Sequence, residues 1–91
     1  MEPDKELLEK AVLGKDAEDF IQSELGKTII KMIEEERVEA VEKLKEVSPW
    51  RKNRIRDLQN QIWRCDSFKG WLAEIVIGGQ QAMSVLDQQS E

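Results

Sequence analysis

The amino-acid sequence predicts an all-α fold: a long antiparallel helical hairpin with a short N-terminal helix. Apolar residues recur at steps of three and four through most of the 91-residue chain, which is the spacing of one helix face. The clearest interruption is Ser48-Pro49, because the residue before a proline resists the helical conformation. We therefore expect one helical domain, residues 1–91, with helices at about 4–13, 17–47 and 49–88.

The first predicted helix is short. Asp4 precedes it, and Asp is a preferred residue for capping the first helical turn. One side of this segment is apolar and consists of Leu7, Leu8, Ala11 and Val12. Gly14 is placed to end the helix, and Asp16 is placed to cap the next one.

The second predicted helix runs from 17 to 47 without a forced break. Its apolar stripe consists of Phe20, Ile21, Leu25, Ile29, Ile30, Ile33, Ala40, Val41, Leu44 and Val47. Gly26 interrupts this helix at a cost of about 1 kcal/mol relative to Ala. On the polar side, Glu39 precedes Lys43 by four residues, which is the favourable order for an ion pair.

Ser48 and Pro49 predict both the hairpin turn and the start of the third helix. Ser is a preferred capping residue, and Pro suits the first helical position because its missing N–H would have no partner there. A seam with alternating steps of three and four follows: Ile55, Leu58, Ile62, Cys65, Lys69, Leu72, Val76, Gly79, Met83 and Leu86. This pattern is typical of a coiled coil or bundle, although Gly78-Gly79 could break the helix.

The middle of the third helix is apolar beyond its seam. Phe68, Trp71 and Ile75 lie on one flank of it, so this stretch needs neighbours on two sides. Helix 17–47 supplies one neighbour, and the other is the first helix or a second copy of the chain. We expect a homo-oligomer, with a dimer favoured, and we expect its contact to include Phe68, Trp71, Leu72, Ile75 and Val76.

The composition limits the chemistry that the chain can perform. There is no His and no Tyr, which removes His-based catalysis and His-ligated metal sites. The single Cys65 lies on the apolar seam, where we expect a buried, unreactive thiol. One enzymatic alternative is a Mg²⁺-dependent nucleotide hydrolase that uses Glu35, Glu36 and Glu39, but a second acidic pair is not evident. We therefore expect no catalytic residues, no metal and no cofactor.

The predicted location of the protein is the cytoplasm. One cysteine fits a reducing compartment, and no apolar run is long enough to cross a bilayer. The first twenty residues also lack the basic start and apolar middle of a secretory signal.

The segment "WRKNRIRD", residues 50–57, is basic although the net charge of the chain is −5. A nucleic-acid-binding regulator could use Lys52, Arg54, Arg56 and an outward-facing Trp63. The competing interpretation is that the cations straddle the seam and pair with glutamates of the preceding helix. We favour that pairing and expect its partners to be Glu39, Glu42 and Glu46. For the tryptophans, we favour core or dimer contacts for Trp50 and Trp71, and we expect Trp63 to cover part of helix 17–47.

Residues 55–83, "IRDLQNQIWRCDSFKGWLAEIVIGGQQAM", resemble small helical proteins encoded by tailed bacteriophages and prophages near their head and packaging genes. The similar positions are Leu58, Gln59, Ile62, Trp63, Arg64, Phe68, Trp71, Leu72 and residues 79–82. The resemblance covers about a third of the chain and carries no catalytic motif. It implies a role in virion assembly or an accessory role, with a phage structural protein as a possible partner.

Overall fold

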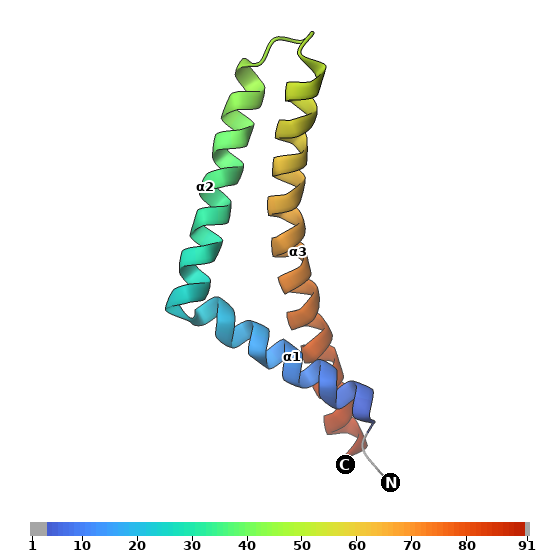
Figure 1. Cartoon of the computed structure of the whole chain (residues 1–91). Coiled ribbons are helices and arrows are strands. Elements are labelled where there is room, and N and C mark those ends of the chain that lie inside the picture. The colour runs from blue at the N-terminus through green and yellow to red at the C-terminus, as the bar shows by residue number, and fades with distance from the viewer. Residues whose placement is uncertain (1–3, 91) are drawn as a thin grey trace.

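The computed structural model describes residues 4–90 and is all-α, as the sequence predicts. Its helices are α1 (Lys5–Gln22), α2 (Glu24–Glu46) and α3 (Lys52–Gln89), and no strand occurs in the described range. α2 and α3 run antiparallel and form the expected hairpin, while α1 crosses α3 and closes the open end (Figure 1). The molecule measures 63 × 27 × 15 Å, so its helices form a thin layer with two broad faces.

α1 is longer than the sequence predicts, because Gly14 does not end it. The expected cap at Asp4 is confirmed, since its carboxylate accepts a hydrogen bond from the Glu6 N–H at 2.9 Å. Gly14 instead lies at the crossing of α1 and α3, where a Cβ atom on it would meet the Gly79 Cα at 2.6 Å. No residue from 4 to 90 has the positive φ of a glycine helix terminus. The predicted end at 13 and the predicted cap at Asp16 are therefore wrong.

The break between the first two helices is at Ser23. Its backbone N–H donates to the Asp19 carbonyl at the end of α1, and its hydroxyl accepts from the Gly26 N–H at 2.9 Å at the start of α2. A Cβ on Gly26 would overlap the Phe20 carbonyl, so the close approach at this bend requires glycine. The continuous helix predicted over 17–47 is consequently two helices, and Gly26 belongs to a helix start.

The hairpin turn is where the sequence places it, but α3 begins three residues later than predicted. The Arg51 N–H donates to the Ser48 carbonyl at 3.0 Å, which closes a four-residue turn with Pro49 in its second position. Pro is favoured at that position because its φ is already fixed near the required value. Ser48 therefore starts a turn rather than capping α3, whose capping position is held by Arg51.

α3 is continuous through Gly78-Gly79, and its seam faces the other helices. Leu58, Cys65 and Gly79 are buried, whereas Met83 is exposed and Ala82 is buried one position earlier. The buried apolar residues of the described chain are mostly small: Ala11, Ala17, Ala40, Leu58, Cys65 and Ala82. Since Leu58 is the sole large side chain of residues 4–90 that is less than 2% exposed, the core is shallow.

Candidate functional site

The two faces of the hairpin differ in chemistry. One face carries ion pairs between α2 and α3, in which Arg37 Nε lies 2.7 Å from Asp66 and Lys69 lies 3.4 Å from Glu34. The pair also raises the pKa of Arg37, mainly through its hydrogen bond to Asp66. Polar contacts therefore fix the register of α2 against α3 on this face.

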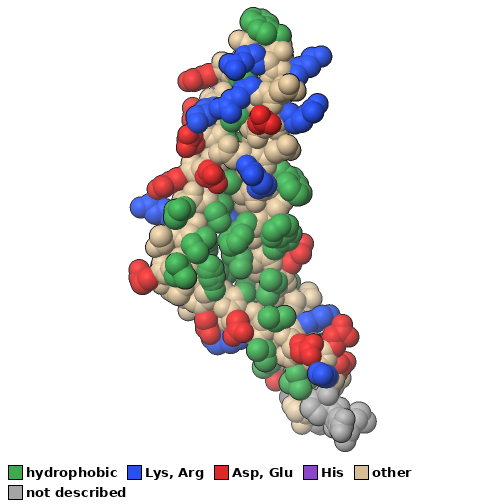
Figure 2. Space-filling view, in the orientation of Figure 1, with side chains coloured by type: hydrophobic (Ala, Val, Ile, Leu, Met, Phe, Trp, Pro, Cys, Tyr) green, Lys and Arg blue, Asp and Glu red, His purple; other side chains and the backbone are tan. Residues whose placement is uncertain are grey.

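The opposite face is apolar, and we call it the apolar face. At about 100° per residue, Phe68, Trp71 and Ile75 fall within about 60° of each other, on the side of α3 away from Asp66. A matching set lies on the side of α2 away from Glu34, and it consists of Leu25, Ile29 and Met32. Figure 2 shows apolar side chains gathered over α2 and α3, above the crossing helix α1. The face thus combines residues from both arms of the hairpin.

The residues predicted for a partner contact divide into two groups. Trp71 and Ile75 are exposed, and Phe68 is partly exposed on the same flank. Leu72 and Val76 are partly buried and lie on the seam between this flank and the ion-paired face. The free surface is therefore formed by the first group together with the α2 residues. Leu25 and Ile29 belong to the predicted apolar stripe, whereas Met32 lies outside it.

The exposed area of the molecule is large for its mass. The accessible surface is 7,230 Å², whereas a folded monomer of 10.6 kDa exposes about 5,500 Å². The excess is carried by apolar side chains as well as charged ones, because Trp71 remains 58% exposed and Met32 61% exposed. A standard protein interface covers about 800 Å² on each partner, which is less than this excess.

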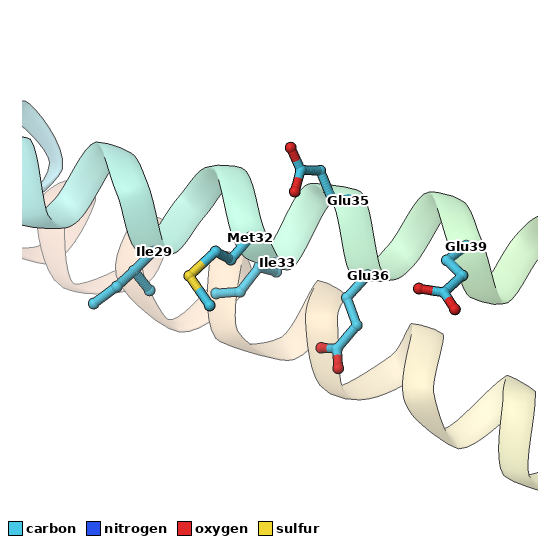
Figure 3. Close-up of a pocket in the computed structure, with 6 residues that line it drawn as sticks. All are labelled: Ile29, Met32, Ile33, Glu35, Glu36 and Glu39. Atoms are coloured by element: carbon cyan, nitrogen blue, oxygen red, sulfur yellow. The ribbon is translucent and has the colours of Figure 1, made fainter.

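The acidic group on α2 does not converge on a site. Glu35, Glu36 and Glu39 border a shallow hollow of about 390 Å³ with Ile29, Met32 and Ile33 (Figure 3). Glu35 points away from α3, whereas Glu36 points toward it and lies 3.9 Å from the Cys65 sulfur. Glu39 is engaged by Lys43 at 2.6 Å, which lowers its pKa and confirms the expected ion pair. Within residues 4–90 no cluster of three metal-ligating side chains is placed to hold an ion.

Cys65 is buried, as the seam predicts. Its side chain is 4% exposed, and burial raises the pKa of the thiol above its ordinary value of 9.0. The neighbouring carboxylates of Glu36 and Asp66 act in the same direction. The thiol is therefore neutral and shielded at physiological pH, which disfavours a nucleophilic role.

The basic segment at the hairpin tip is free of the ion pairs that the sequence analysis favoured. Over the described part of the chain, no salt bridge involves Arg51, Lys52, Arg54 or Arg56. Two of the expected partners, Glu39 and Glu42, instead pair with Lys43 and Lys45 of their own helix. The prediction of cross-helix pairing is therefore wrong, and the four cations remain exposed.

The aromatic residues near the tip are also exposed. Trp50 is 78% exposed at the turn and does not belong to the core, and Trp63 is 64% exposed on α3. At about 100° per residue, Trp63 falls between Lys52 and Arg56 on the outer flank of α3, as the sequence predicts. The favoured expectation that Trp63 covers part of α2 is wrong, because this flank faces away from the buried seam. Figure 2 shows Lys and Arg side chains gathered around this end of the molecule.

Comparison with models of protein families, with curated proteins and with solved structures found no match to this chain. Among the described residues, no helix has both the length and the apolar character needed to cross a membrane. The two exposed surfaces on which a function can be based are the apolar face and the hairpin tip.

Proposed function

We propose that this chain is a non-enzymatic helical interaction protein that self-associates as a dimer through its apolar face. The observation that carries this proposal is the exposure of Trp71, Ile75 and Met32 on one side of a single layer of helices. Complete burial of an Ile or Met side chain contributes about 1.5–3 kcal/mol relative to its exposure, so a monomer that leaves several of them exposed loses this stabilisation. A second copy is the favoured occupant because it brings an equal apolar area to the contact.

Static light scattering and sedimentation test the proposal directly. The wild-type chain should have twice its 10.6 kDa mass at micromolar concentration. Trp71→Glu should weaken the dimer by about 30-fold or more, since a central Trp of an interface contributes about 2 kcal/mol or more. The Trp71 side chain is exposed, so this substitution does not disturb the core.

Trp63→Glu is the matched control. Trp63 is 64% exposed, close to the 58% of Trp71, but it lies on the outer flank of α3. The control should keep the dimeric mass. A wild-type chain that stays monomeric at about 100 µM would overturn the proposal, because specific dimers usually bind more tightly than that. Dissociation by Trp63→Glu alone would show that the dimer contact lies on the outer flank of α3 and not on the apolar face.

We also propose an accessory role in the assembly of tailed-phage virions, acting in the cytoplasm. Support comes from the resemblance of residues 55–83 and from the single cysteine, which suits a reducing compartment. The test is the gene neighbourhood. Adjacent portal, terminase or capsid genes are the expected result, and a chromosomal setting without phage genes would remove this role while leaving self-association intact.

A further inference from the structure

The outer flank of α3 near the tip combines cations that form no salt bridge within residues 4–90 with aromatic rings that are exposed to solvent. We infer that this flank binds single-stranded nucleic acid, with the cations contacting phosphates and with Trp50 and Trp63 stacking on bases. The inference is independent of self-association, because the flank lies on a different side of α3 from the apolar face.

The segment that forms the hairpin turn and the first turns of α3 is basic. Residues 48–64 contain five Lys/Arg and one Asp, which gives a net charge of +4. Since the whole chain has a net charge of −5, the other residues together carry −9. The single carboxylate, Asp57, falls on the flank of α3 that bears the apolar face, at about 100° per residue. Asp66, the next acidic residue along α3, is engaged by Arg37 at 2.7 Å. No carboxylate of α3 therefore falls on its outer flank between Lys52 and Trp63.

The arrangement along the helix suits a linear polyanion. Lys52, Arg56 and Trp63 fall within about 40° of one another, and the eleven residues from first to last rise by about 16 Å. Trp50 extends this stripe to the turn, where a shallow hollow of about 310 Å³ forms. The hollow is lined by Trp50, Arg51, Lys52, Asn53 and Arg54. A positively charged track with stacking platforms at intervals is the usual design of single-strand binders.

Other anionic partners fit the stripe less well. A flat lipid surface that meets the tip would contact Trp50 and leave Trp63 several helical turns away, whereas a strand can follow the helix past both. A duplex offers phosphates but keeps its bases stacked, so it makes no use of the exposed rings. The overall negative charge of the protein weakens binding to any polyanion and makes it dependent on salt.

Fluorescence anisotropy with a fluorescein-labelled oligothymidylate of about 16 nucleotides tests the inference at about 20 mM salt. We expect saturable binding whose log–log salt slope is about −2 to −3, from three or four phosphate contacts at about −0.7 each. Lys52→Glu combined with Arg56→Glu should abolish binding. Trp63→Ala should weaken it about fivefold or more, as expected for the loss of one stacked base.

The matched control reverses two cations elsewhere. Lys27 and Lys31 are exposed on α2, and Lys27→Glu with Lys31→Glu changes the net charge by the same amount. This control should retain most of the affinity. An equal loss of affinity in both double variants would show that binding depends on net charge alone, and it would overturn the inference. All of these side chains are exposed, so we expect each variant to keep its α-helix content, which circular dichroism measures.

Two further arms decide the class of partner. A duplex of the same length should bind more weakly than the single strand, and vesicles containing phosphatidylserine should not co-sediment the protein. Equal or tighter binding of the duplex would overturn the stacking contacts. Vesicle binding without oligonucleotide binding would assign the stripe to a membrane surface and overturn the inference, as would absence of oligonucleotide binding at about 100 µM protein.

Discussion

Substitution of the neighbouring glycines Gly78 and Gly79 by alanine tests the helix crossing that sets the shape of the molecule. A Cβ on Gly79 would meet the Gly14 Cα at 2.6 Å and the Lys10 carbonyl oxygen at 3.0 Å. A Cβ on Gly78 would meet nothing within 4 Å. Both residues lie inside α3, so each substitution gains about 1 kcal/mol of helix propensity. The two variants therefore differ in the crossing alone.

We expect Gly78→Ala to stabilise the protein by about 1 kcal/mol. Gly79→Ala should be less stable than Gly78→Ala by about 1–3 kcal/mol, which is the usual cost of inserting atoms into a closely packed contact. The atoms in the way belong to backbone, so rotation of a side chain cannot relieve the overlap. The free energy of unfolding is measured by urea denaturation at one fixed protein concentration, because association would otherwise shift the midpoint.

Gly14→Ala approaches the same crossing from the other helix and should lose stability in the same way. Gly70→Ala is a second control, because its Cβ would also meet open space. If Gly79→Ala proves as stable as Gly78→Ala, α1 does not cross α3 at this point. The contact between α1 and α3 would then need to be placed elsewhere.

Three other changes have defined outcomes. Ser23→Ala should cost about 1 kcal/mol in urea denaturation, because it removes the hydroxyl that caps α2, and an unchanged midpoint would contradict the cap. Gly26→Ala should be more damaging, because its Cβ overlaps the Phe20 carbonyl, and thermal melting should show a larger loss than for Ser23→Ala. The pKa of Cys65 is higher in the folded chain than its ordinary 9.0, so its contribution to stability is complete below that pH and is lost as pH rises above it. Cys65→Val should remove this part of the alkaline destabilisation, and an identical pH profile would contradict it.

The helices and the hairpin were predictable from local sequence, because periodicity and the Ser48-Pro49 turn are properties of neighbouring residues. The division between α1 and α2 was not, because it depends on a contact between distant residues and on a helix cap that lies inside an apolar stripe. Gly14 resembles a helix end until Gly79 is known to lie against it, a contact across 65 residues of sequence. Ser23 with acidic Glu24 after it is an ordinary helix start, but it lies inside an apolar stripe that continues across the bend.

The surfaces were predicted in part, for a related reason. The helical spacing of about 100° per residue places Phe68, Trp71 and Ile75 on one flank of α3 and Trp63 on another, from the sequence of α3 alone. It does not give the rotation of α2, which decides whether Glu39, Glu42 and Glu46 face the basic segment. That rotation is set by burial of Ala40 and by the Arg37–Asp66 pair, and it turns these glutamates toward solvent. The predicted ion pairs between these glutamates and the cations at the tip therefore do not form within residues 4–90.

The two proposed activities are compatible because they use different sides of one helix. The stripe of Lys52, Arg56 and Trp63 is separated from Trp71 by about 60–100° around α3 and by about two turns or more along it. A dimer formed through the apolar face would leave both stripes free and would carry two of them. Two linked sites raise apparent affinity for a strand long enough to reach both, without any new contact. Trp71→Glu should therefore weaken binding of a long oligonucleotide while leaving that of a short one unchanged. Loss of both in equal measure would show that Trp71 itself contacts the strand.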